Sequence, residues 1–87
     1  MNLKFKLDLI KQVNKSSLSF GEKVRLRQAI MWRPDVVEYF KMEMESAYSE
    51  ENPSVSAIDW ENFDWEAAAE FWVKVIESIA KIIIAVI

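Results

Sequence analysis

The sequence predicts an all-α protein, because turn-forming residues are scarce and apolar residues recur at helical spacing. The 87 residues include one Gly and two Pro, which is too little turn chemistry for a β-sandwich or a β-barrel. Apolar residues make up 52% of the chain, above the usual ~45–50%, so a globally disordered chain is not expected. We expect three short helices, at about 3–14, 20–32 and 34–48, and a long C-terminal helix at about 64–87.

The first predicted helix, at about 3–14, is amphipathic. Residues 3–9 alternate between apolar and polar, which would suit a strand, but the longer window to Val13 favours a helix. Its apolar residues share one side of a helical wheel, interrupted only by Lys6: Leu3, Phe5, Leu7, Leu9, Ile10 and Val13. Residues 14–17 are expected to form a loop.

The second predicted helix, at about 20–32, begins with a capping box. Ser19 stands three residues before Glu22, and an apolar run follows. The apolar residues of this helix split between two faces, one with Phe20, Val24 and Met31 and the other with Leu26, Ala29 and Ile30. A helix of this kind usually contacts two neighbours.

Arg33 and Pro34 separate the second helix from the third, at about 34–48. The residue before a proline avoids the α region, whereas proline itself suits a first helical turn. The third helix carries an apolar stripe: Val36, Val37, Phe40, Met44, Ala47 and Tyr48. Residues 49–58 contain Pro53 and polar residues, and they are expected to be an exposed linker between a helical region at 1–48 and a C-terminal region at 59–87.

The C-terminal helix, at about 64–87, carries most of the information on function. A turn or short helix is expected at 59–63, with Asp59 and Asp64 as caps. The apolar arc of the long helix spans roughly 240° of the wheel, against the ≳100° of an ordinary surface helix. Eight residues of this arc are the predicted partner-binding residues: Trp65, Trp72, Val75, Ile76, Ile79, Ile82, Ile83 and Val86.

Three functions fit this pattern. The leading hypothesis is a structural or assembly protein that forms a homo-oligomer or docks on a protein partner through the C-terminal helix, because the arc exceeds what three short helices can cover. The first alternative is a membrane-associated protein, with this helix at or in the bilayer and the basic N-terminal third at the headgroups. The second is a small acidic inhibitor that binds another protein through residues 43–66. Small size without catalytic motifs is also common among proteins of viruses and mobile elements.

Charge is distributed unevenly along the chain. Residues 1–33 hold eight Lys or Arg against two Asp or Glu, a net +6, whereas residues 34–87 hold three against twelve, a net −9. The halves either attract each other or leave a basic end that meets phosphate. The candidate phosphate contacts are Lys23, Arg25, Arg27 and Arg33. Nucleic acid is the less favoured source of that phosphate, because a solvated helix face explains the same charges.

The residue types argue against catalysis. The chain has no Cys and no His, so it lacks thiolate chemistry, the commonest metal ligand and the side chain best suited to proton transfer at neutral pH. The carboxylates at 59–66 lack the spacing and central Gly of a calcium loop. We therefore expect no enzyme, no cofactor, no metal and no small-molecule substrate. Charged residues interrupt the N-terminal apolar run, so no signal peptide is predicted and a cytoplasmic location is expected.

Overall fold

The computed structural model describes residues 3–54 and 58–87. These residues form four α-helices and one short 3-10 helix: α1 (Leu3–Lys15), α2 (Phe20–Trp32), α3 (Pro34–Glu51), η1 (Trp65–Ala68) and α4 (Ala69–Val86). The described part of the chain contains no strand. The predicted all-α class is therefore confirmed.

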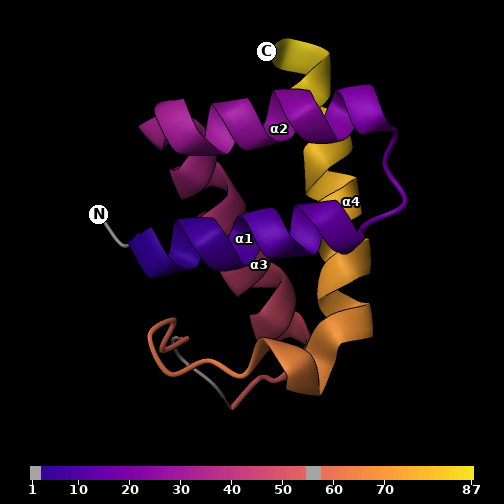
Figure 1. The fold of residues 1–87 in the computed structure, drawn as a ribbon. Helices are drawn as coiled ribbons and strands as arrows, with labels where there is room; N and C mark the ends of the chain where they lie inside the picture. Colours follow the sequence, from indigo (N-terminus) through magenta and orange to yellow (C-terminus); the bar gives the residue numbers. More distant parts are fainter. Residues whose placement is uncertain (1–2, 55–57) are drawn as a thin grey trace.

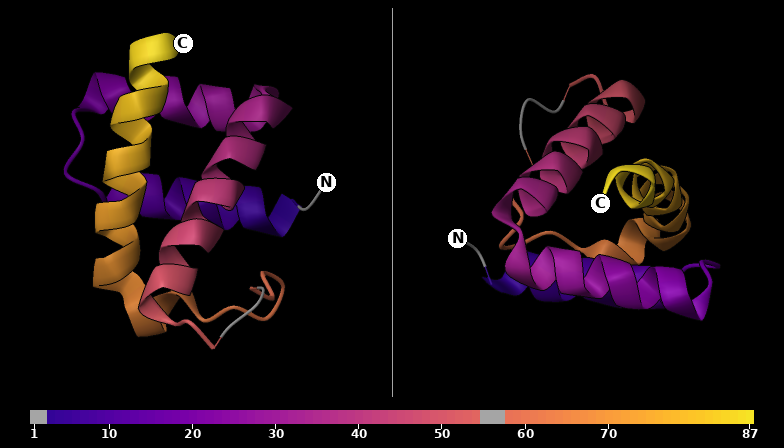
Figure 2. Two further views of the ribbon diagram at one scale, coloured as in Figure 1. Left: turned by 180° about the vertical axis from the view of Figure 1, so that it is seen from behind. Right: turned by 90° about the horizontal axis from the view of Figure 1, so that it is seen from above.

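The helices form two layers (Figure 1). α1 and α2 lie side by side and antiparallel in one layer. α3 and α4 run antiparallel to each other in the second layer and cross the first layer steeply, as the view from above shows (Figure 2). α4 contacts α1, α2 and α3. These three helices together cover much of its apolar arc.

Both predicted boundaries of α2 are confirmed. The Ser19 side chain accepts a hydrogen bond from the Glu22 backbone N at 3.2 Å, and the Ser19 backbone N donates to Glu22 Oε1 at 3.0 Å. This reciprocal pair is a capping box, and it also lowers the pKa of the Glu22 carboxyl. At the other end, Arg33 adopts an extended conformation and Pro34 opens α3.

α3 is longer than predicted and continues to Glu51, three residues into the expected linker. Residues 49–51 are polar but favour helix, so their composition does not stop it. Asn52 ends the helix instead, since its backbone N and its Nδ2 both donate to the Tyr48 carbonyl, and Pro53 follows. Part of the predicted linker, residues 55–57, lies outside the described residues.

The C-terminal helix begins with a tighter turn than predicted. Asp64 accepts hydrogen bonds from the backbone N atoms of Glu66 and Ala67, at 3.1 and 3.3 Å. The next residues form the 3-10 helix η1, and Ala69 continues in the right-handed α conformation into α4. The expected cap at Asp64 is thus confirmed.

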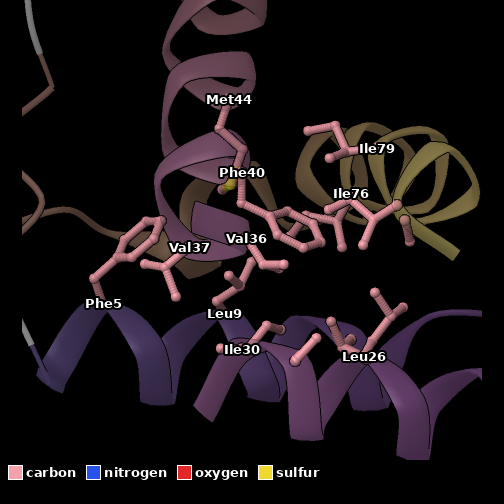
Figure 3. Close-up of a cluster of buried hydrophobic side chains, with 14 of the residues drawn as sticks. Phe5, Leu9, Leu26, Ile30, Val36, Val37, Phe40, Met44, Ile76 and Ile79 are labelled. Carbon is pink, nitrogen blue, oxygen red and sulfur yellow. The ribbon is translucent and has the colours of Figure 1, made fainter. Parts of the chain in front are cut away.

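The core lies between the two layers and has an aliphatic and an aromatic part. Side chains from α1, α2, α3 and α4 converge in the aliphatic part, where Leu9, Leu26 and Ile76 are fully buried (Figure 3). The aromatic part gathers rings from α1, α3, α4 and the segment between them: Phe5, Tyr48, Trp60, Phe63, Trp65, Phe71 and Trp72. The Phe5 and Trp60 rings meet edge to face with their centroids 4.8 Å apart. These rings hold the segment after α3 against α1.

Candidate docking surface

Most of the predicted partner-binding residues lie inside the molecule. Trp65, Trp72, Ile76, Ile79 and Ile83 are buried in the chain's own core. They are buried because α1, α2 and α3 all pack on α4, so in this fold these five side chains are not available to a partner. Much of the C-terminal arc is therefore an intramolecular core, and partner binding through this helix remains a prediction.

The other three predicted residues remain accessible. The side chains of Ile82 and Val86 are 54% and 79% exposed, and Val75 is half-buried. Ile82 and Val86 lie near the end of α4, close to the start of α3. The region in which a partner could contact α4 is therefore its last two turns.

Residues from α2 and α3 extend this region into one apolar surface. We call it the α4-end surface, and its members are Arg25, Trp32, Arg33, Val36, Tyr39, Ile82, Val86 and Ile87. A hollow of about 310 Å³ lies between α3 and α4, and Val36, Tyr39, Ile82, Ile83 and Val86 supply its apolar walls. The start of α3 and the end of α4 both lie against α2 at this place (Figure 2, left).

Trp32 stands beside this hollow. It is the last residue of α2 and its side chain is 80% exposed. A second hollow, lined by Trp32, Arg33 and Ile87 among others, shares Arg33 and Ile87 with the first. The turn at Arg33–Pro34 ends α2 at this point, and so it leaves the indole at the edge of the fold rather than in the core.

Both arginines of this surface make hydrogen bonds within the chain. Arg33 Nη2 and Nε donate to the two carboxylate oxygens of Asp35, at 2.8 and 3.3 Å. This guanidinium lowers the pKa of Asp35. Arg25 Nη2 donates to the carbonyl oxygens of Ile84 and Ile87, at 3.5 and 3.3 Å, where a cation is favoured by the helix dipole. The Arg33 charge is therefore neutralised by Asp35, whereas Arg25 keeps its positive charge, which is opposed only by the dipole of α4.

The four candidate phosphate contacts do not form one site. Lys23 Nζ and Arg27 Nη1 both hydrogen-bond Asn14, on the side of α2 that faces α1, through its carbonyl oxygen and its Oδ1 respectively. Arg25 and Arg33 lie on the α4-end surface instead. A single phosphate held by all four side chains is excluded by this separation.

The described residues of the range 43–66 expose mainly polar side chains, and carboxylates are the most numerous of these. Tyr48, Trp60, Phe63 and Trp65 pack in the aromatic part of the core, so this region offers a partner acidic side chains rather than rings. Asp59 accepts a hydrogen bond from Asn62 Nδ2 at 2.8 Å, which lowers its pKa. No group of three potential metal ligands occurs among the described residues.

Sequence reasoning did not identify Trp32, Val36 and Tyr39 as surface partners of the C-terminal helix. An apolar aromatic directly before Arg33 and Pro34 was the one local signal for Trp32, since the last residue of a helix is often exposed. Val36 and Tyr39 gave no signal, because their hollow forms only when α3 meets α4.

No helix in the described part of the chain is long and apolar enough to cross a bilayer. Comparison with known proteins adds no functional information: no protein-family model, curated protein or solved structure matches this chain.

Proposed function

We propose that this protein is a non-enzymatic assembly protein whose copies pair through the α4-end surface. One observation carries the proposal: the 80% exposed indole of Trp32 stands beside an apolar hollow of about 310 Å³ on the same surface. The exposed Trp32 ring of one copy can therefore fill the apolar hollow of a second copy.

The position of Trp32 beside the hollow on the same surface favours a symmetric dimer. In a two-fold dimer the same patch serves both subunits, so Trp32 of each copy enters the hollow of the other. Each hollow is walled by Tyr39 and by the aliphatic side chains of Ile82 and Val86. Tryptophan is enriched among the residues that dominate binding energy when it fills a pocket in this way.

Charge compensation supports the same pairing. A two-fold interface brings each charged group close to its own copy, so net charge on the patch would repel. The Arg33 guanidinium is paired with the Asp35 carboxylate, and Arg25 faces carbonyl oxygens at the end of α4. Arg33 therefore adds no like-charge repulsion to the pairing, and the dipole of α4 opposes the charge of Arg25.

A mixing experiment tests the proposed geometry. Trp32→Ala removes the ring and keeps the hollow, whereas Ile82→Asp charges the wall of the hollow and keeps the ring. Each variant alone should dimerise at least about 30-fold more weakly than the unmodified protein, as expected for a dominant interface residue. Their mixture restores one of the two contacts, so heterodimers should form more readily than either homodimer. Phe20→Ala is the matched control, because Phe20 is also 80% exposed but lies at the opposite end of α2.

Two results would count against this proposal. One is a mixture that associates no better than its components. The other is a Phe20→Ala variant that loses association as strongly as Trp32→Ala.

A further inference from the structure

The outer face of the α1–α2 layer is apolar although it points away from the core. On α2, Leu26, Ala29 and Ile30 are buried, and the second apolar face, with Phe20 and Met31, is exposed. α1 likewise exposes Leu3 and Leu7, although the sequence predicted them on one side of the helix with the buried residues Phe5, Leu9 and Val13. We call these exposed side chains, together with the cations among them, the α1–α2 outer face. α3 and α4 cover only the other side of this layer (Figure 2, right).

The charge of this layer is strongly positive. α1 and α2 hold seven Lys or Arg against two carboxylates, Asp8 and Glu22. Asp8 is paired with Lys4 at 3.2 Å, and Glu22 belongs to the capping box. Most α3 charges are carboxylates, and α3 lies in the other layer. The molecule is thus basic on one side and acidic on the opposite side.

Three cations of the outer face donate hydrogen bonds to neutral acceptors, so they are positioned but keep their positive charge. Lys6 Nζ donates to the Met31 carbonyl at 3.4 Å, and Lys23 Nζ donates to the Asn14 carbonyl at 3.0 Å. Arg27 Nη1 donates to Asn14 Oδ1 at 3.1 Å. These acceptors are neutral, so the positive potential of the face remains, and Lys11 adds an exposed fourth cation.

We propose that the α1–α2 outer face binds the surface of an anionic lipid bilayer. Leu3, Leu7, Phe20 and Met31 would enter the boundary between headgroups and acyl chains, while the lysine stems reach outward to lipid phosphates. Stable attachment to a membrane surface takes two signals, and this face combines apolar side chains with a basic cluster. The acidic helix α3 then points away from the bilayer, which avoids repulsion from anionic headgroups.

A bilayer fits this face better than a folded protein partner does. The apolar side chains are spread over two helices with cations between and beside them, and an open hollow along Leu3, Leu7 and Ile10 lies within the face. A protein partner needs a complementary shape, whereas a lipid surface adapts to the shape it meets. Surface binding also needs no spanning helix.

Sedimentation with vesicles tests this assignment on the full chain. The protein should bind vesicles of phosphatidylcholine with about 30% phosphatidylserine, bind pure phosphatidylcholine much less, and lose binding as salt screens the headgroups. The double variant Lys6→Gln/Lys11→Gln should lower the partition coefficient about 25-fold, or about fivefold for each cation. Phe20→Ala should lower it as well.

The matched control is Lys74→Gln/Lys81→Gln, which makes the same change in net charge on α4 and should leave vesicle binding unchanged. Trp32→Ala should also leave vesicle binding unchanged. The vesicle assay therefore tests the membrane proposal separately from the proposed dimer contact at the α4-end surface. Equal binding to neutral and anionic vesicles, or binding to neither, would overturn the proposal. Self-association at low salt that Lys6→Gln/Lys11→Gln abolishes, without vesicle binding, would assign the face to the acidic α3 of a second copy instead.

Discussion

Ser17 donates two hydrogen bonds to the same carboxylate oxygen, Oε1 of Glu77. Its backbone N lies 2.8 Å and its Oγ 2.9 Å from this atom, across 60 residues of sequence. Ser17 belongs to the loop between α1 and α2, and Glu77 lies in the middle of α4. The pair therefore ties one layer of the fold to the other, and these two donors lower the pKa of the Glu77 carboxyl.

Glu77→Gln should destabilise the fold in a pH-dependent way. A carboxyl whose pKa is lowered by folding adds stability above its ordinary pKa of 4.5 and loses that contribution as the pH falls through the lowered value. The melting temperature of Glu77→Gln should therefore lie below that of the unmodified protein at pH 7, and the two should converge in acid. Glu70→Gln, at an exposed position of α4, is the control and should show no such convergence. A gap between the two proteins that is the same at pH 7 and in acid would contradict this role.

Trp72→Ala should cost about 3–5 kcal/mol of unfolding free energy, as for other buried aromatics. The Trp72 side chain is 0% exposed and stacks on Tyr48 with ring centroids 5.7 Å apart. The same change at Trp32, measured in dilute solution, should stay within about 0.5 kcal/mol, because that ring is exposed. Denaturant titration compares the two, and similar losses at both positions would contradict the burial difference.

Ser19→Ala should cost about 1 kcal/mol, because it removes the hydrogen bond that the Ser19 hydroxyl accepts from the Glu22 backbone N at the start of α2. Ser46→Ala, at an exposed position inside α3, makes the same chemical change without touching a cap. A melting temperature that falls as far for Ser46→Ala as for Ser19→Ala would show that the capping box adds nothing specific.

The helix boundaries that depend on local chemistry could be predicted from the sequence. Ser19 and Glu22 set the start of α2, and Pro34 set the start of α3, because caps and proline act within a few residues. The end of α3 was placed too early at Tyr48, since the polar residues that follow also suit a helix. Its observed end depends on the Asn52 cap and on Pro53.

The candidate site could be predicted only in part. The apolar arc of α4 was correctly identified as wider than a surface helix needs, but a helical wheel does not show which neighbour covers which side chain. α1, α2 and α3 together cover Ile79 and Ile83 and leave Ile82 and Val86 exposed. The two apolar faces of α2 predicted contact with two neighbours, and α2 contacts α1, α3 and α4, but its face with Phe20 and Met31 stays exposed. Both surfaces proposed here arise from these uncovered faces.

The mass of the unmodified protein in solution tests the central claim most directly. Sedimentation equilibrium over a range that reaches high micromolar concentration should show a monomer–dimer equilibrium with a limiting mass twice that of the chain. Because the Trp32 contact is apolar, added salt should leave this equilibrium nearly unchanged, and Trp32→Ala should shift it to monomer. A protein that remains monomeric at the highest concentration, or that dimerises equally well as Trp32→Ala, would contradict assembly through the α4-end surface.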